Sequence, residues 1–233
     1  MGSSRLPGKV LMESVGKPML ELMVERLKRV PSLDGIVIAT TTNPGDRPIE
    51  ELAGRLGVGC HRGSEDDVLA RLIGATEEHG IEVVVQTTGD CPLIDPVVVE
   101  ECIQIYRRSN VDYVSNILER SYPIGMDTQV FAASVLADVA RRTDDPVDRE
   151  HGSVFIYHHP EIYSLKNVAA PEALTDPKLR LTLDTAEDYK LIDRIFADLY
   201  PANSAFTLGN VLTLLRNNPD YRAFNADIRH RYV

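Results

Sequence analysis

The first segment whose residue types could do chemistry is residues 2–9, which read GSSRLPGK. Glycines let backbone amides approach a polyphosphate, and the hydroxyls of Ser3 and Ser4 would add donors. Arg5 and Lys9 supply the positive charge that a chain with a net charge of −10 needs in order to hold a nucleotide. These features predict a triphosphate-binding loop.

This loop differs from a Walker A motif in two respects. Five residues separate Gly2 from Gly8 where the motif has four, and Val10 stands where Ser or Thr would bind magnesium. No apolar run precedes the loop, although phosphate loops of α/β domains normally follow a strand. A flexible N-terminal tail is therefore the alternative interpretation.

Two carboxylates each follow an apolar run. Asp90 comes after residues 81–87, and Asp184 comes after residues 180–183. Ligands of α/β proteins bind at the carboxyl ends of strands, and carboxylate oxygens there could hold magnesium against a triphosphate. We therefore predict that Asp90, Asp184 and the basic loop form a magnesium–triphosphate site.

The same segments also have structural interpretations. Asp90 could close a turn, and Asp95 fits the N-cap of a helix. Thr185 and Asp188 have the spacing of a capping box, which would leave Asp184 free to bind a metal.

Other polar residues are weaker candidates. Arg149 and His151, in the sequence DREH, could meet an anionic substrate, but a solvated helix start explains them as well. The adjacent His158 and His159 cannot share a helix face, which favours a surface position over a metal site. Cys91 has no histidine near it in sequence and fits a small buried residue better than a nucleophile.

The apolar pattern predicts short strands that alternate with amphipathic helices. Strands are expected at residues 35–40, 58–60, 81–87, 112–115, 128–131, 162–165 and 180–183, and helices at 17–30, 47–56, 67–79, 95–108, 133–142, 185–200, 208–216 and 219–230. This rhythm indicates an α/β protein with right-handed crossovers and a mainly parallel sheet. Because the rhythm changes after Val111, we expect a small lobe at residues 111–170 within a single domain of residues 1–233.

Composition excludes several classes of protein. Hydrophobic residues make up 43% and charged residues 26%, which argues against disorder throughout. The acidic net charge argues against duplex nucleic acid as the main partner. No apolar run reaches the roughly 18 to 20 residues of a membrane span, and no signal peptide is visible. Three cysteines without metal-type spacing, Cys60, Cys91 and Cys102, lead us to expect a cytoplasmic protein with free thiols.

Seven segments, taken in order, together resemble a known family. They are residues 1–11 (MGSSRLPGKVL), 16–20 (GKPML), 62–69 (RGSEDDVL), 89–95 (GDCPLID), 112–116 (DYVSN), 149–151 (REH) and 180–185 (RLTLDT). Over essentially its whole length, the chain resembles the cytidylyltransferases of the spore-coat polysaccharide biosynthesis type. These are relatives of the acylneuraminate (CMP-sialate) and CMP-Kdo synthetases.

The resemblance implies a three-layer α/β/α, Rossmann-like nucleotidyltransferase that binds CTP with Mg²⁺. Such an enzyme joins CMP to an acidic sugar for surface polysaccharide biosynthesis and releases pyrophosphate. Catalytic roles would fall to Arg5, Lys9, Asp90 and Asp184, the two aspartates being the magnesium ligands. Nucleotide binding would add Gly2, Ser3, Ser4, Arg71, Thr88 and Gly89, and the acceptor sugar would meet Asn116, Arg149, His151 and Arg180.

The chain departs from this family at its start. Members usually have a strand and a short basic run before Met-Gly-Ser-Ser-Arg, whereas here Met1 coincides with that internal methionine. Our hypothesis is a start assigned too late or a truncated chain. We therefore expect the first, central strand to be missing, neighbouring strand edges to be exposed, and Arg5 and Lys9 to lose their anchorage. The loop also reads LPGKV where sialate synthetases carry Ile-Pro-x-Lys-Asn, so the acceptor need not be sialic acid.

Other functions stay open on the sequence alone. A nucleotide-sugar glycosyltransferase usually holds its metal with Asp-x-Asp, which is absent from this chain. A nucleotidyltransferase for another NTP and a sugar phosphate would share the GKPML segment. An inactive nucleotide-binding homologue would fit a lost strand. The acceptor sugar is undefined, and a homodimer through residues 111–170 is an expectation by analogy.

Overall fold

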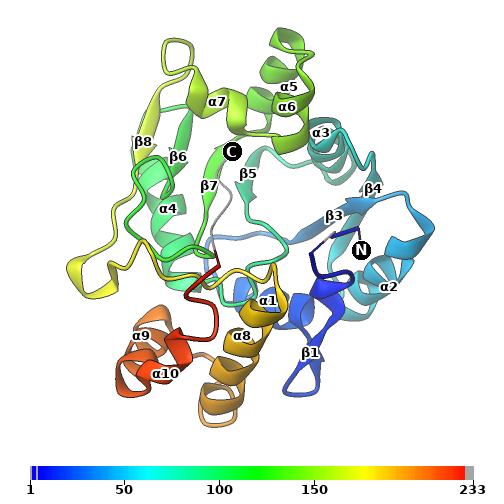
Figure 1. The fold of residues 1–233 in the computed structure, drawn as a ribbon. Helices are drawn as coiled ribbons and strands as arrows, with labels where there is room; N and C mark the ends of the chain where they lie inside the picture. Colours follow the sequence, from blue (N-terminus) through cyan, green and yellow to red (C-terminus); the bar gives the residue numbers. More distant parts are fainter. Residues whose placement is uncertain (1, 4, 229–233) are drawn as a thin grey trace.

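The computed structural model describes residues 2–3 and 5–228, which form an α/β fold (Figure 1). The helices are α1 (Met19–Leu27), α2 (Arg47–Leu56), α3 (Val68–His79), α4 (Pro96–Arg108), α5 (Ala133–Arg142), α6 (Pro146–His151), α7 (Val154–His158), α8 (Ala186–Leu199), α9 (Leu208–Asn217) and α10 (Pro219–Arg222). The strands are β1 (Glu13–Ser14), β2 (Lys17–Pro18), β3 (Val37–Thr41), β4 (Gly59–Gly63), β5 (Val83–Gln86), β6 (Tyr113–Ser115), β7 (Gln129–Ala132) and β8 (Leu165–Asn167). Short 3₁₀ helices are η1 (Lys9–Leu11), η2 (Pro44–Asp46) and η3 (Glu172–Leu174).

Local sequence signals explain where the central helices begin and end. The Asp67 side chain accepts a hydrogen bond from the Ala70 amide at the start of α3, and Gly80 ends that helix with a φ of 62°. Asp95 caps α4 by accepting from the Val97 amide, with proline at the first helical position. The structure thus confirms Asp95 as an N-cap.

The strands form a mixed arrangement, not the mainly parallel sheet that we expected. Strand β3 pairs in parallel with β4, and a four-stranded sheet has the order β5-β7-β6-β8. In it, β7 runs antiparallel to both β5 and β6, and β6 runs parallel to β8. Residues 116–128 connect β6 to β7 without the helix that usually carries a parallel crossover, and the two strands pair antiparallel. The strands of residues 111–170 thus extend the sheet of β5, and the lobe expected there stays a prediction.

Two further expectations about elements are wrong. Residues 180–183 are not a strand, because their amides bond to two different segments: Leu181 N donates to Ile124 O and Leu183 N donates to Asp90 O. No continuous ladder can form from such alternating partners. The last expected helix, residues 219–230, ends as α10 at Arg222.

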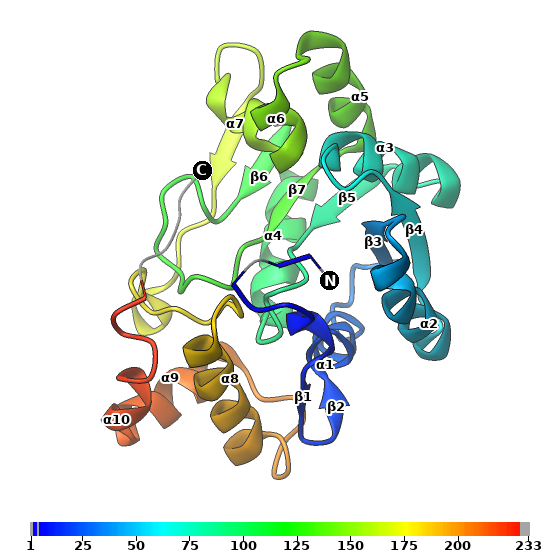
Figure 2. The ribbon, with the colours of Figure 1, turned by 45° about the vertical axis from the view of Figure 1, so that its right-hand side comes forward.

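Two hydrophobic clusters hold these elements together. The larger one contains Met19 of α1, Val99 of α4 and Phe196 of α8, all fully buried. The second contains Phe131 of β7 and Leu136 of α5. Figure 2 shows the corresponding arrangement, with α8–α10 at one end of the molecule and α5–α7 at the other. Within the described residues, no helix has the length and apolar character needed to cross a bilayer.

Strands β3 and β5 are not paired with each other. Among the described residues, β3 has β4 as its strand partner and β5 has β7. One edge of each of these strands therefore has no strand partner within the described residues, and the missing first strand stays a prediction.

Candidate active site

The ammonium group of Lys9 lies between two carboxylates. Its Nζ donates to Asp90 Oδ2 at 2.7 Å and to Asp184 Oδ1 at 2.8 Å. Arg5 Nη2 is 3.2 Å from the same Asp184 oxygen. The structure therefore brings together all four residues that the sequence singled out for catalysis. The expected loss of anchorage for Arg5 and Lys9 does not occur, because both cations are ion-paired.

The cluster is sheltered but reachable. Side-chain exposure is 15% for Lys9, 26% for Asp90 and 11% for Asp184. Burial disfavours the charge on Lys9, but Asp90 and Asp184 outweigh it and raise the lysine pKa. Burial likewise opposes ionisation of Asp184, yet hydrogen bonds and charge from Lys9 and Arg180 hold its pKa below the ordinary value. Lys9 and Asp184 are therefore both charged near neutral pH.

Backbone contacts fix the two carboxylates relative to each other. Leu183 N donates to Asp90 O at 2.7 Å, and Thr182 Oγ1 donates to the same oxygen at 3.2 Å. These bonds join the turn after β5 to the segment before α8, although about ninety residues separate them. The register of this contact brings Asp90 and Asp184 to one cation.

A network of hydrogen bonds between buried side chains holds Asp184 in place. Arg180 Nη2 donates to Asp184 Oδ2 at 2.5 Å, and its Nε donates to Asp188 Oδ1 at 2.9 Å. Asn225 Nδ2 donates to Asp188 Oδ1 at 2.8 Å and to Arg180 O at 3.0 Å. Asp188 also completes the capping box of α8 with Thr185, as the sequence predicted. Thr185 and Asp188 therefore cap the helix and leave Asp184 to face Lys9.

The remaining residues expected near the nucleotide have varied surroundings. Ser3 Oγ accepts from the Leu6 amide at 3.3 Å. Gly2 lies against Glu65, whose Oε1 would be 2.9 Å from a Cβ at that position. Gly89 is exposed next to Val10. Ser4 lies outside the described residues.

The side chains of Arg71 and Thr88 each contact a residue that is close in sequence. Arg71 Nη1 donates to the carbonyl oxygen of Ser64, while its Nε is buried without a partner among the described residues. Burial lowers the pKa of this guanidinium. Thr88 Oγ1 lies 3.2 Å from Cys91 Sγ. Cys91 is buried, and burial raises the pKa of its thiol well above the ordinary value, as fits an inert cysteine.

The residues expected at the acceptor have hydrogen-bond partners within the protein, and their role at the acceptor stays a prediction. Asn116 is buried and uses its amide to bind Met126 O at 2.7 Å and Thr128 N at 2.9 Å. Arg149 holds Asp67 at 2.6 Å, and Arg180 is buried beneath Asp184. These side chains hold loops and helix ends in place, because their hydrogen-bonding groups are already engaged. The fourth residue, His151, is partly exposed at the end of α6.

Sequence reasoning missed an ion pair on the same side of the sheet. Arg120 Nη1 and Nη2 donate to the two oxygens of Asp127 at 2.6 and 2.8 Å. Asp127 directly precedes Thr128 and β7, whose first residue pairs with the last residue of β5.

The donor set suits one particular kind of cation. Two carboxylates already converge on one ammonium position, and carboxylate oxygens are the ligands that Mg²⁺ prefers. No group of three or more His, Cys, Asp or Glu side chains with metal-binding geometry occurs in the part of the chain that the structure describes. The residues therefore fit a magnesium ion that is held jointly with phosphate oxygens and water.

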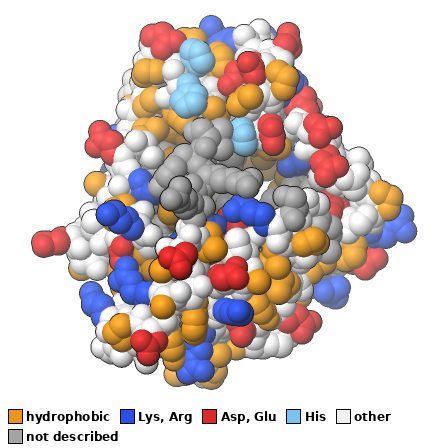
Figure 3. Space-filling model, viewed as in Figure 1, with side chains coloured by type: hydrophobic (Ala, Val, Ile, Leu, Met, Phe, Trp, Pro, Cys, Tyr) orange, Lys and Arg blue, Asp and Glu red, His pale blue; other side chains and the backbone are white. Residues whose placement is uncertain are grey.

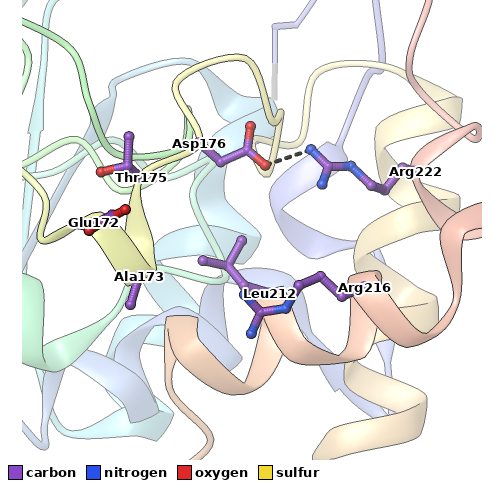
Figure 4. A pocket seen from close by; sticks show the side chains of 7 residues that line it. All are labelled: Glu172, Ala173, Thr175, Asp176, Leu212, Arg216 and Arg222. Carbon is purple, nitrogen blue, oxygen red and sulfur yellow. Dashed lines mark hydrogen bonds and ion pairs between the residues drawn. The ribbon is translucent and has the colours of Figure 1, made fainter.

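Other surface features are less suited to chemistry. A small cavity of about 140 Å³ lies between η3, α9 and α10, where Arg222 is already paired with Asp176 at 2.5 Å (Figure 4). On the face seen in Figure 3, Lys and Arg side chains alternate with Asp and Glu, without a continuous basic surface outside the grey atoms. The absence of a nucleic-acid partner stays a prediction.

Comparison with known proteins finds similarity along most of the chain. A family model described as cytidylyltransferase matches residues 1–216. The spore coat polysaccharide biosynthesis protein SpsF of Bacillus subtilis is 34% identical over 227 residues, which cover 94% of this chain and 92% of that protein. An 8-amino-3,8-dideoxy-manno-octulosonate cytidylyltransferase of Shewanella amazonensis is 27% identical over 176 residues, 70% of each chain. A cytidylyltransferase structure from Leptospira borgpetersenii has a TM-score of 0.89 and 28% identity, and covers 100% of this chain and 95% of that one.

Proposed function

The chain belongs to the cytidylyltransferase family, and from this premise we propose that it transfers CMP from CTP to the hydroxyl of an acidic sugar. The observation that carries the proposal is the Lys9 ammonium held between Asp90 and Asp184, with Arg5 beside it. Two cations and two carboxylates at one point can bind a nucleoside triphosphate together with a divalent cation. Similarity to a cytidylyltransferase that acts on an eight-carbon sugar acid supports the acceptor class.

The reaction is a displacement at the α-phosphorus of CTP. A sugar hydroxyl oxygen forms the new bond to phosphorus, the bond to the β-phosphate breaks, and pyrophosphate leaves with that electron pair. The hydroxyl proton passes to solvent or a base. Because the attacking and leaving oxygens must lie roughly in line, the protein acts mainly by positioning and by neutralising charge.

The loop of residues 2–9 supplies the cations. Arg5 and Lys9 neutralise the charge that accumulates on the leaving pyrophosphate, and backbone amides near Gly2 and Gly89 bind phosphate oxygens. Lys9 is suited to this role because its four-carbon stem can move the ammonium from the carboxylates to a phosphate. Arg180 keeps Asp184 ionised and in place without touching substrate.

We propose Asp90 and Asp184 as the residues that hold a magnesium ion, with CTP oxygens completing its ligands. When bound, this ion neutralises phosphate charge and lowers the pKa of the attacking hydroxyl. Asp184 suits the role because its pKa is depressed, so that its carboxylate is available well below neutral pH.

The acceptor would bind on the side of β6 and β7. Arg120 is the cation of that region, and its guanidinium can take the carboxylate of an acidic sugar in place of, or together with, Asp127. Arg120 joins Asn116, Arg149, His151 and Arg180 as a candidate for acceptor binding.

The proposal is tested by pyrophosphate release from each of the four NTPs, with Mg²⁺ and a panel of eight- and nine-carbon acidic sugars. We expect release with CTP and one class of acidic sugar, and its loss in Asp184→Asn. Release with UTP or GTP and a neutral sugar phosphate would contradict the proposal. Asp220→Asn, an exposed carboxylate on α10, is the matched control.

A further inference from the structure

The ammonium group of Lys9 engages the two oxygen atoms that a metal ion would need. Lys9 Nζ lies 2.7 Å from Asp90 Oδ2 and 2.8 Å from Asp184 Oδ1. Magnesium binds its oxygen ligands at about 2.0 to 2.1 Å, so an ion on both oxygens would lie within about 5 Å of Nζ. Two cations this close repel each other. Lys9 and a divalent cation therefore compete for the same two carboxylates.

The charges of this cluster already balance. Among the described residues, three cations and three carboxylates form one chain of ion pairs: Arg5, Lys9, Arg180, Asp90, Asp184 and Asp188. No group of three metal-binding side chains occurs in the same part of the protein. A divalent cation that enters without an anion would therefore add two uncompensated positive charges at a sheltered position, which costs free energy.

A triphosphate changes this balance. It brings negative charge together with oxygen atoms that can both bind a metal and accept a hydrogen bond from an ammonium. The backbone of Lys9 is held by its neighbours, because its amide donates to Leu6 O at 3.2 Å and its carbonyl accepts from Met12 N at 3.2 Å. Only the flexible side chain has to turn for the ammonium to pass from the carboxylates to a phosphate.

Arg5 carries the same charge as Lys9 but has a different position. Its Nη2 lies 3.2 Å from Asp184 Oδ1, and no ion pair with Asp90 occurs among the described residues. Its side chain is 33% exposed, against 15% for Lys9. Arg5 therefore adds positive charge beside the site without lying between the two carboxylates. The two cations separate the effect of charge from the effect of an occupied position.

We propose that Lys9 blocks the metal position of the free protein: its ammonium keeps divalent cations from Asp90 and Asp184 until a triphosphate accepts it. The inference rests on the proposed function, which supplies the metal-binding role of the two aspartates. It adds that metal and nucleotide enter together, so that the free protein binds divalent cations weakly. By linkage, the nucleotide raises the affinity for the metal by the same factor as the metal raises the affinity for the nucleotide.

The test measures Mn²⁺ binding without nucleotide or sugar, from the electron paramagnetic resonance signal of free Mn²⁺. It compares the wild type with Lys9→Met, with Arg5→Met and with Lys190→Met, which changes an exposed lysine of α8. We expect the Kd for Mn²⁺ to fall at least ten-fold in Lys9→Met, to fall less in Arg5→Met and to stay unchanged in Lys190→Met. Adding Asp184→Asn to Lys9→Met should restore weak binding, because it removes one metal ligand.

Three results would overturn the proposal. The first is an equal Kd in the wild type and in folded Lys9→Met. The second is an equal decrease in Arg5→Met, which would assign the effect to net charge alone. The third is tight binding that survives Asp184→Asn, which would place Mn²⁺ at another site.

A measurement on the wild type covers the case in which Lys9→Met does not fold. The protein is treated with acetic anhydride, and the modification of Lys9 is followed by mass spectrometry of its peptides. Mn²⁺ alone should leave this modification unchanged, because the ammonium stays with Asp90 and Asp184. Modification of Lys9 that increases with Mn²⁺ would show that the metal displaces the ammonium without a nucleotide, which contradicts the proposal.

This test can fail separately from the proposed function. Tighter Mn²⁺ binding in Lys9→Met, with no sugar nucleotide formed by the wild type, would contradict the proposed function alone. Cytidylyl transfer by the wild type, with equal Mn²⁺ affinities in the wild type and Lys9→Met, would contradict only the blocking role of Lys9.

Discussion

The Lys9 ammonium lies 2.8 Å from a carboxylate oxygen of Asp184, a residue 175 positions further along the chain. This contact joins the glycine-rich loop to the segment that starts α8. It shows that segments far apart in the sequence contribute to one charged cluster. The proposed function depends on that cluster, and each of its residues can be substituted separately.

Replacing Lys9 by Met should reduce catalysis without unfolding the protein. The variant keeps the stem of the side chain but removes the cation that neutralises phosphate charge. We expect kcat to fall by about 10²- to 10³-fold, as when one preorganised donor to a developing anion is removed. Steady-state pyrophosphate release measures it, with Lys190→Met, an exposed lysine of α8, as the control. An unchanged kcat in Lys9→Met would rule out its role in the reaction.

The same variant should have a characteristic dependence of stability on pH. The pKa of Asp184 is lower in the folded protein than in the unfolded chain. Its ionised carboxylate therefore stabilises the fold above the unfolded pKa of about 3.9, and this stabilisation is lost as the pH falls through the folded pKa. The pKa of Lys9 is higher in the folded protein than in the unfolded chain. Its ammonium group therefore stabilises the fold below the unfolded pKa of about 10.4, and this stabilisation is lost as the pH rises through the folded pKa. The free energy of unfolding, measured in urea, should therefore be larger for the wild type than for Lys9→Met from about pH 5 to 9. This difference in free energy should become smaller below about pH 4 and in strong alkali. A difference that does not depend on pH would contradict this pairing.

Arg180 should prove essential for stability. Arg180→Met leaves Asp188, which is completely buried, without its cation. Breaking a buried pair from one side typically costs about 3 to 5 kcal/mol. Equilibrium unfolding of Arg180→Met should show a loss in this range, and the double variant with Asp188→Asn should recover part of it. A loss below about 1 kcal/mol in the single variant would show that the pair is unimportant.

Arg120 provides a test of the acceptor side. In Arg120→Met the acceptor carboxylate loses its partner, while the CTP site is untouched. We expect the KM for the sugar to rise at least ten-fold, with little change in the KM for CTP. Arg142→Met, which removes an exposed arginine paired with Asp138, is the control. An equal rise in the KM for the sugar and in the KM for CTP would contradict a role of Arg120 in binding the acceptor.

Cys91 should be chemically inert although it neighbours Asp90. Its thiol is buried and its pKa is raised, so little thiolate is present at neutral pH. A maleimide reagent should modify the partly exposed Cys60 before Cys91, and Cys91→Ala should keep activity within about ten-fold of wild type. Rapid labelling of Cys91 with loss of activity would indicate a different role for this residue.

The sequence was informative where local patterns decide the structure. Asp95, Thr185 and Asp188 form the helix caps that their spacing predicts. The grouping of Asp90 and Asp184 with the basic loop could be predicted from the strand ends at which the two carboxylates were expected, and the family resemblance implied the catalytic role of Lys9. These features depend on residues close in sequence or on a motif.

Long-range contacts could not be predicted in this way. Residues 180–183 have the composition of a strand, but their partners are Ile124 and Asp90, which no local pattern reveals. Arg180 was expected at the acceptor, and its burial with Asn225 depends on how the C-terminal segment packs. The antiparallel course of β7 accompanies a connection without a helix after β6, which the alternating rhythm upstream did not indicate.

The most direct test of the central claim follows the α-phosphorus of CTP. CTP labelled at that phosphorus is incubated with Mg²⁺, the protein and a panel of acidic sugars, and the products are separated. The account predicts that the label appears in a sugar nucleotide, in equal amount to the pyrophosphate released, and that neither product forms in Asp184→Asn. Label that stays in CTP with every sugar, or label recovered only in free CMP, would contradict a cytidylyl transfer at the Lys9–Asp90–Asp184 cluster.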